Sequence, residues 1–325
     1  MRRGLIGWDP SEVPEAALDA RLARLQAAMK KDGLGCVLVY TNFPRPAAVS
    51  YLTHFVPYWS QSLLVVFPDG APSLVSANTK RVAGWMEETS HLGEVICTGA
   101  IGEGTAKLIR DTGAKRIGIV EMAKLPGGIG VPLKKALGDA RLEDATDLFA
   151  RIRHPADDAE VWLSRKAARI AFDALDAALG REHRATGTLI AAIEGPAREA
   201  GAEEVIIAVA PDLARDARLA RIEGEQVLAA RHAVRVSVAY KGHWIRITRT
   251  KGDDGGNLDR AIAGLAAGAS LPKGCVAEVT IGSAPLTHVT KLPPGSVASL
   301  SFVFDGPVLS GVPVLVPERG KVTRL

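Results

Sequence analysis

Hydrophobic and polar residues alternate through two neighbouring stretches in the second half of the chain, residues 234–240 and 244–250. A period of two places apolar side chains on one face of a β-strand, so each stretch predicts a strand with one buried face. Lys241-Gly242, which lies between them, predicts a tight turn. We therefore expect a β-hairpin here, and this hairpin is the centre of the predicted architecture.

In the first half of the chain, helical and strand patterns follow one another. Apolar residues recur at helical spacing in residues 11–31, and Gly33 is typical of a helix end. Strands are expected at residues 36–40, 62–67 and 73–77, and helix and strand then alternate at 80–88, 95–98, 104–111 and 116–120. Asp69-Gly70 predicts a hairpin turn between the second and third of these. The order predicts an α/β domain that ends near residue 150.

The second half begins with a linker at residues 149–155, where Pro155 favours the start of a helix. A long helix is expected at about residues 158–179, and another at 188–200, bent or broken at Gly195-Pro196. Further elements are predicted as a helix at about 258–267 and strands at 295–301 and 311–317. Residues 127–130 are rich in glycine but do not match a dinucleotide fingerprint, and we predict a loop there.

Composition excludes several classes of protein. At 325 residues the chain can bury a sizeable core and predicts two domains. The net charge of +4, from 40 basic and 36 acidic residues, argues against nucleic acid as a partner. No apolar run approaches membrane-spanning length, and the amino terminus lacks the apolar core of a signal peptide. Three widely spaced cysteines without a CxxC motif favour a reducing compartment, so we expect a cytoplasmic protein.

The predicted hairpin resembles that of the creatinase, prolidase and aminopeptidase P family, the "pita-bread" metallohydrolases. The family pattern is Asp-x-Gly-x-x-Tyr-x-Gly-Tyr-x-x-Asp-hydrophobic-Thr-Arg-Thr. The residues that match its frame are Tyr240, Gly242, Ile247, Thr248, Arg249 and Thr250. His243 replaces the second tyrosine of the pattern. Residues 33–40, 51–53 and 68–70 are similar to the family's amino-terminal domain, so the resemblance covers nearly the whole chain.

The resemblance implies a fold and a domain organisation. We expect an α/β amino-terminal domain of the creatinase type at residues 1–150. An α+β pita-bread domain is expected at residues 151–325. It is truncated, because the segment between Arg246 and Cys275 is much shorter than in catalytic relatives and leaves room for one helix.

The resemblance also implies where metal ligands should stand. In the family two Asp, one His and two Glu hold two divalent ions, and a bridging water becomes the nucleophile. The two Asp positions fall on Arg235 and Arg246, and the two Glu positions on Ser301 and Gly311. Two guanidinium groups about 5 Å apart already repel by roughly 3 kcal/mol at an effective dielectric near 20, so a cation between them is disfavoured. We therefore expect no metal and no other cofactor.

The family's remaining ligand and its substrate-contacting histidine are also replaced. The ligand histidine belongs to a Gly-His-Gly-Ile-Gly…His-Glu-x-Pro segment, whose nearest counterpart here runs from 274–278 to 282–285. This alignment puts Cys275 on the ligand position. The substrate-contacting histidine is expected near residues 215–218, where the chain has none.

Two interpretations of the arginine pair are open. In the favoured one, Arg235 and Arg246 form ion pairs that fill the vacated site. Candidate counter-charges are Glu203, Glu204, Glu223, Glu225, Glu278 and Asp305. In the other, the arginines form an anion pocket, because the planar guanidinium suits a carboxylate or a phosphate. The residues predicted to bind a ligand are then Arg235, Arg246, Ser301 and His243.

Three residues could move protons or attack a substrate. His243 and His288 could act as acid or base near neutral pH, although packing or surface roles suit both. Cys275 could be a nucleophile if a neighbouring cation lowered its pKa, although a lone cysteine in an apolar strand is usually inert. These residues are weak candidates for a catalytic role, and only if the fold has been adapted to a metal-independent reaction.

The expected function is that of a metal-free member of this Xaa-Pro peptidase family that binds a small anionic ligand or a protein partner. Resemblance implies a dimer, formed with a second copy or with an active paralogue, without nucleic acid or membrane. The alternative is a metal-independent hydrolase or lyase that acts on a small carboxylate or amide. A second alternative is a metallohydrolase with displaced ligands.

Overall fold

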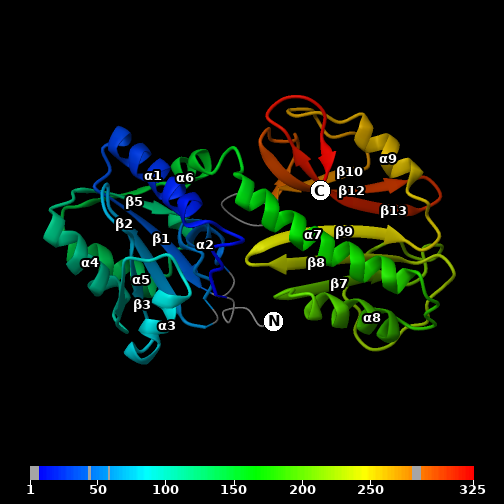
Figure 1. The fold of residues 1–325 in the computed structure, drawn as a ribbon, viewed down its shortest axis with the longest axis horizontal. Coiled ribbons are helices and arrows are strands. Elements are labelled where there is room, and N and C mark those ends of the chain that lie inside the picture. Colours follow the sequence, from blue (N-terminus) through cyan, green and yellow to red (C-terminus); the bar gives the residue numbers. More distant parts are fainter. Residues whose placement is uncertain (1–6, 43–44, 58, 280–286) are drawn as a thin grey trace. The chain divides into compact units, whose positions relative to one another are not determined.

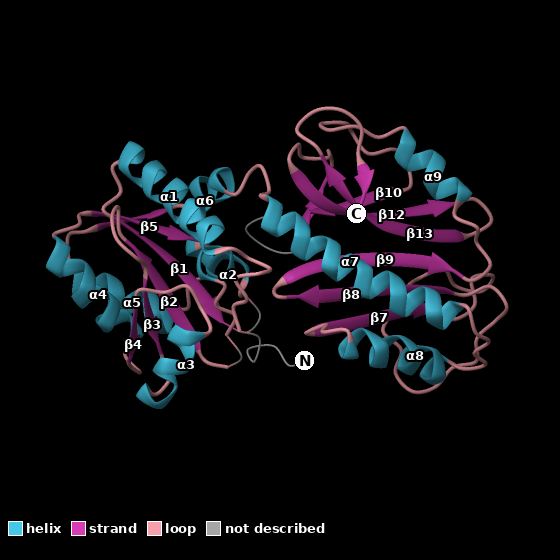
Figure 2. Ribbon diagram, in the orientation of Figure 1, coloured by secondary structure: helices cyan, strands magenta, loops and turns pink. Residues whose placement is uncertain are grey.

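The computed structural model of the chain describes residues 7–42, 45–57, 59–279 and 287–325 (Figures 1 and 2). It divides into two compact units, with the division between His154 and Pro155. We call them the first and second domains and describe each by itself. In the described residues no helix is both long and apolar enough to cross a membrane.

The first domain is built on a six-stranded sheet with the order β4-β3-β2-β1-β5-β6. The strands are β1 (Cys36–Asn42), β2 (Gln61–Val66), β3 (Ser73–Ser76), β4 (Glu94–Cys97), β5 (Arg116–Val120) and β6 (Arg141–Asp144). β2 pairs antiparallel with both β1 and β3, and the remaining neighbours are parallel. The predicted hairpin of residues 62–77 is therefore confirmed.

Helices cover both faces of this sheet. They are α1 (Glu15–Asp32), α2 (Ala47–Thr53), α3 (Ala83–Glu88), α4 (Ile101–Thr112), α5 (Gly127–Leu137) and α6 (Thr146–Ile152), with short 3₁₀ turns at Lys80–Val82 and Met122–Lys124. Alternate residues of β1 separate two apolar cores. Val37 and Val39 pack with α1, α2 and α6, while Cys36 and Leu38 pack with α4 and α5. This is the predicted α/β domain.

The loop predicted at residues 127–130 is wrong, because these residues begin helix α5 after Pro126. Glycine is a weak helix former, so the local sequence gives little indication of this helix. Packing supplies the reason: a Cβ on Gly102 of α4 would lie only 2.5 Å from the carbonyl oxygen of Ile129. The two helices therefore approach closely because residue 102 of α4 has no side chain.

The second domain contains an eight-stranded antiparallel sheet with the order β11-β10-β12-β13-β9-β8-β7, and β14 also pairs with β13. The strands are β7 (Glu204–Ala210), β8 (Ala233–Tyr240), β9 (His243–Thr250), β10 (Cys275–Val279), β11 (Thr287–Val289), β12 (Ser296–Phe304), β13 (Val308–Val316) and β14 (Thr323–Arg324). The strands predicted at 295–301 and 311–317 match β12 and β13, displaced by a few residues.

Helices α7 (Asp158–Leu179), α8 (Thr186–Glu199) and α9 (Gly256–Ala263) belong to this domain. In Figure 1 α7 lies across β8 and β9, and α8 lies along β7. Asp157, rather than Pro155, caps α7: its carboxylate accepts a hydrogen bond from the N–H of Glu160 at 2.9 Å. The second helix was predicted to be bent or broken at Gly195-Pro196; a break is wrong, because α8 continues through Pro196.

The central hairpin forms as predicted from β8 and β9, joined by Lys241 and Gly242. Both turn residues have positive φ, 45° for Lys241 and 80° for Gly242, as a two-residue type I′ turn requires. This turn fixes the register, so Arg235 lies opposite Thr248 and Ser237 lies opposite Arg246. The hairpin therefore determines which side chains share a face of the sheet.

Candidate functional site

The sheet of the second domain has a helix-covered face and an opposite face. Ile245 and Ile247 of β9 are fully buried, and the Arg249 guanidinium lies 5.2 Å from the ring centroid of Phe172 on α7. Successive side chains of a strand point to opposite faces. Arg246 and Thr248 therefore point away from α7. We call this opposite side the arginine face.

Strand register brings the predicted site residues together on the arginine face. One row of cross-strand neighbours runs through Ala208, Arg235, Thr248, Gly311, Ser301 and Val276. The adjacent row contains Ile206, Ser237, Arg246, Ser299, Glu278 and His288. The N–H of Arg246 donates to Ser299 Oγ at 3.1 Å, which links the two halves of the second row. Arg235, Arg246 and Ser301 thus share one surface.

Arg246 is held by two neighbours. Its Nε donates to Ser237 Oγ at 3.0 Å, and its Nη1 forms an ion pair with Glu278. The Glu278 side chain is 7% exposed and that of Arg246 is 20% exposed, so the pair is largely removed from water. His288 Nε2 lies 3.5 Å from the other Glu278 carboxylate oxygen, but the His288 side chain is 72% exposed. The ion-pair interpretation therefore holds for Arg246.

Arg235 differs from Arg246, because it has no hydrogen bond or ion pair within the described residues. Burial lowers the pKa of Arg235, and the charge of Arg246 lowers this pKa further, while Glu278 opposes the shift. Glu278 already compensates Arg246, so the local group carries one uncompensated positive charge on Arg235. A nearby anion would stabilise the charged form of such a half-buried side chain.

Two hydroxyl groups, those of Thr248 and Ser301, flank Gly311 in the row that contains Arg235. A Cβ on Gly311 would lie 3.2 Å from Thr248 Oγ1, 3.3 Å from Ser301 Oγ and 2.7 Å from the Leu300 carbonyl oxygen. Thr248 is buried, and its hydroxyl has no hydrogen-bond partner among the described residues. Buried hydroxyls are usually satisfied, so an unpartnered one beside Arg235 points to a missing acceptor.

Two predicted candidates lie on the wrong face. His243 has the same parity along β9 as Ile245 and Ile247, so it points to the helix-covered face and does not join Arg235. Cys275 packs against the core beneath β10 and β12, and burial raises the pKa of its thiol to about 11. These positions argue against His243 as a ligand contact, and against Cys275 as a metal ligand or a nucleophile. Residues 282–285, which supported the alignment of Cys275, lie outside the described residues.

The residues of the arginine face do not fit a dinuclear metal centre. In the described part of the chain, the two rows offer Glu278 and His288 as metal donors, beside two arginines. Within the described residues, three metal-donor side chains lie together only in the first domain, at Glu15, Asp19 and His91. The Glu15 and Asp19 side chains are largely exposed, and exposed acidic groups are common without a metal.

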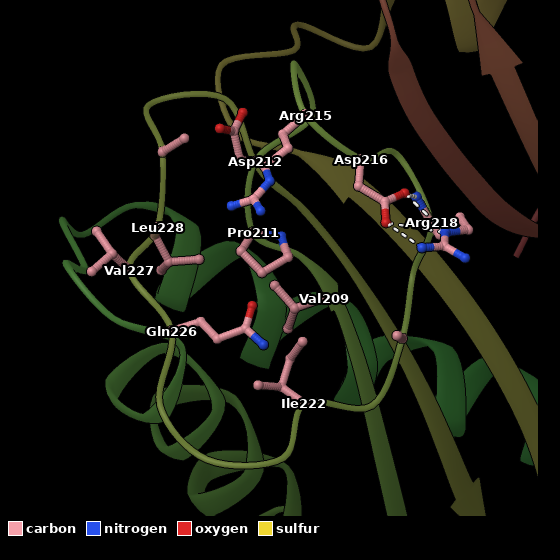
Figure 3. Close-up of a pocket in the computed structure, with 12 residues that line it drawn as sticks. Val209, Pro211, Asp212, Arg215, Asp216, Arg218, Ile222, Gln226, Val227 and Leu228 are labelled. Carbon is pink, nitrogen blue, oxygen red and sulfur yellow. Dashed lines mark hydrogen bonds and ion pairs between the residues drawn. The ribbon is translucent and has the colours of Figure 1, made fainter.

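A separate cavity of about 800 Å³ lies in the loop between β7 and β8 (Figure 3). It occupies the region of residues 215–218, where the family resemblance implies a histidine. Val209, Pro211 and Ile222 supply apolar lining, with Arg215 and the Gln226 amide among its polar groups. Asp216 and Arg218 form an exposed bidentate ion pair with distances of 2.8–3.1 Å, which lowers the pKa of Asp216 to about 2.

Residues that the sequence analysis did not single out complete the arginine face. Thr248 was recognised only as part of the hairpin frame, and Glu278 only as one of six possible counter-charges. Thr248 could have been found, because it lies two residues beyond Arg246 on the same strand. The pairing of Glu278 with Arg246 depends on the order β10-β12-β13-β9, which the local sequence does not specify.

Comparison with known proteins agrees with this architecture. Residues 21–154 match the family model of the creatinase/prolidase N-terminal domain. A comparison with curated protein sequences gives no match. The matched residues cover most of the first domain.

Solved structures share the fold of the whole chain. The prolidase from Pyrococcus horikoshii OT3 is 17% identical, with a TM-score of 0.72 over 94% of this chain and 97% of that chain. The Xaa-Pro dipeptidase from Bacillus anthracis is 18% identical, with a TM-score of 0.70 over 94% and 97%. The X-Pro aminopeptidase from Thermotoga maritima is 16% identical, with a TM-score of 0.71 over 92% and 97%. At these identities the likeness establishes the fold.

Proposed function

We propose that this chain, whose first domain is a creatinase/prolidase N-terminal domain and whose whole fold is that of prolidases and aminopeptidases P, binds a small anion without a metal. The pita-bread fold predicted from the hairpin is confirmed. A fold alone does not fix an activity, so the proposal rests on the arginine face.

The observation that supports the proposal most directly is the unpaired Arg235. Its guanidinium is half-buried beside an ion pair that is already complete, and the adjacent Thr248 hydroxyl also has no partner within the described residues. An anion on this face supplies both the missing charge and a missing acceptor. A bound cation meets two fixed positive charges and one carboxylate that is already paired, so a metal is disfavoured.

Metal content tests the metal-free part of the proposal. We expect protein incubated with Mn²⁺, Zn²⁺ or Co²⁺ and then desalted to retain less than one ion per chain by mass spectrometry. We also expect its melting temperature to stay unchanged. Two retained divalent ions per chain would overturn this part and support a metallohydrolase with displaced ligands.

Titration calorimetry tests the anion site with acetate, butanoate, succinate and inorganic phosphate as probes. We expect at least one probe to bind, and Arg235→Gln to weaken its binding at least tenfold, because a hydrogen-bonded charge is lost. Arg215→Gln is the matched control, since it removes the same charge from the separate cavity between β7 and β8. Binding that responds to Arg215→Gln instead, or binding of no probe, refutes the arginine face as the site.

A further inference from the structure

We infer that the anion is the single carboxylate of a small organic acid with an apolar body. Arg235, Thr248 and Ser301 bind the carboxylate, and Val276 and Val303 contact the body. The inference rests on the proposed function and specifies its ligand. It follows from the charge of the arginine face, its hydrogen-bond donors and the apolar side chains beside them.

The charge of the face selects a monoanion. Arg246 and Glu278 neutralise each other within one ion pair, and Arg235 adds one positive charge. One carboxylate balances this charge. A phosphate dianion or a dicarboxylate brings a second negative charge next to Glu278, which is 7% exposed and therefore poorly screened by water.

The donors match the acceptor capacity of a carboxylate. An ionised carboxylate accepts about four hydrogen bonds, and a guanidinium can supply two of them as a planar fork. The hydroxyls of Thr248 and Ser301 flank Gly311 and can supply the other two. The Thr248 hydroxyl is buried and has no hydrogen-bond partner among the described residues.

Apolar side chains lie next to this group on the same face. Val276 is the cross-strand neighbour of Ser301 and is 48% exposed. Val303 stands two residues beyond Ser301 on β12, so it has the same orientation, and it is 60% exposed. Large apolar side chains on a surface are informative when they adjoin a polar site. Here they provide a contact for hydrocarbon beside the carboxylate group.

The test compares acids of one charge but different length by titration calorimetry, using acetate, butanoate and hexanoate. We expect affinity to rise about two- to fourfold per added methylene, until the hydrocarbon extends beyond Val276 and Val303. Val303→Ser reduces this gain, because it removes an apolar contact for the hydrocarbon. Succinate and inorganic phosphate bind more weakly than butanoate.

Thr248→Val provides the decisive variant, because it keeps the branched shape and removes the hydroxyl. We expect it to weaken butanoate binding about tenfold, while the melting temperature without ligand stays the same or rises. Ser301→Ala should weaken butanoate binding in the same way. Thr250→Val is the control: the Thr250 hydroxyl is already bonded to Leu309, so its loss lowers stability but not affinity.

The outcomes separate this inference from the proposed function. If no probe binds to the wild type, the proposed function fails. The proposed function stands and the carboxylate assignment falls if phosphate binds more tightly than butanoate and depends on Arg235. Wild-type affinity for butanoate in Thr248→Val, or equal affinity for acetate and hexanoate, also overturns the assignment.

Discussion

At the scale of single residues, the arginine face depends on one ion pair that is largely buried. Arg246 bonds to both Ser237 and Glu278, whereas Arg235 has no such partner in the described residues. Two arginines eleven positions apart in the sequence therefore have different roles. Arg246 holds Glu278 in place, and Arg235 provides the free charge.

Arg246→Gln should destabilise the second domain by about 3 kcal/mol, because it leaves the Glu278 carboxylate buried without its counter-charge. Arg235→Gln is the matched control, and it should change the free energy of unfolding by no more than about 0.5 kcal/mol. Urea denaturation measures both. Adding Glu278→Gln to Arg246→Gln should recover most of the loss. Equal effects of the two arginine variants contradict the assignment.

Cys275 should be a slow nucleophile in the folded protein. Its pKa of about 11 leaves roughly one thiol in a thousand ionised at pH 8, and the thiolate is the reactive form. We expect iodoacetamide to label Cys275 much more slowly in native protein than in urea, and the native rate to rise about tenfold per pH unit up to pH 10. Mass spectrometry of the labelled peptides measures these rates. Native labelling as fast as in urea would show an activated thiol.

Sequence reasoning found the arginine pair because the hairpin motif fixes Arg235 and Arg246 within a short, regular segment. It favoured a packing or surface role for His243, and the parity of His243 with Ile245 indicates the helix-covered face. Cys275 was assigned through a distant motif with weak spacing, and such an alignment does not define a face. The contact between Arg246 and Glu278 joins residues from non-adjacent strands, so only the folded sheet reveals it.

At the scale of elements, the type I′ turn determines the geometry of the site. Gly242 has φ of 80°, and its N–H donates to both carboxylate oxygens of Glu203, at 3.1 and 3.3 Å. Glu203 was considered as a counter-charge for the arginines, but here it supports the turn. This turn sets the strand register that places Arg235 opposite Thr248.

Gly242→Ala should lower the free energy of unfolding by about 1 kcal/mol or more, because an L-residue with a side chain is strained at this positive φ. Gly195→Ala in helix α8 provides the control, since nothing lies within 4 Å of its added Cβ. That change should raise stability by up to about 1 kcal/mol. Denaturant midpoints of both variants measure the effects. A stable Gly242→Ala protein would show that the turn is not as described.

The strands were easier to predict than some of the helices. Alternation over seven or eight residues defines β8 and β9 well. The two-residue turn then fixes their register, because a shift of one residue would move the apolar side chains to the other face. Helix α5 begins with Gly127 and Gly128, which have weak helical propensity, and it is stabilised by packing against Gly102 of α4. Propensity alone therefore missed an element that tertiary contact supports.

At the scale of the whole molecule, the chain has separate apolar cores in its two domains. The first-domain cores include Leu25, Leu64 and Ile109, and those of the second include Leu300 and Val312. The fold could be predicted because motifs in both halves keep the family's spacing. The ion pair between Arg246 and Glu278 could not be predicted, because it depends on which side chains the folded sheet brings together.

Because the cores are separate, calorimetry should resolve two unfolding transitions. Gly102→Ala should lower only one of them, since its Cβ would lie 2.5 Å from the backbone oxygen of Ile129 within the first domain. Arg246→Gln should lower only the other. The two variants act as controls for each other. If both shift a single transition together, the domains unfold as one unit.

The close approach at Gly311 has an evolutionary consequence. Any side chain there would press its Cβ to 2.7 Å from the Leu300 carbonyl of the neighbouring strand. Resemblance to the pita-bread enzymes implies a glutamate at this position, yet one codon change to glutamate cannot be accommodated until β12 and β13 move apart. A glutamate at residue 311 would therefore require the backbone of β12 or β13 to shift as well as the residue to change.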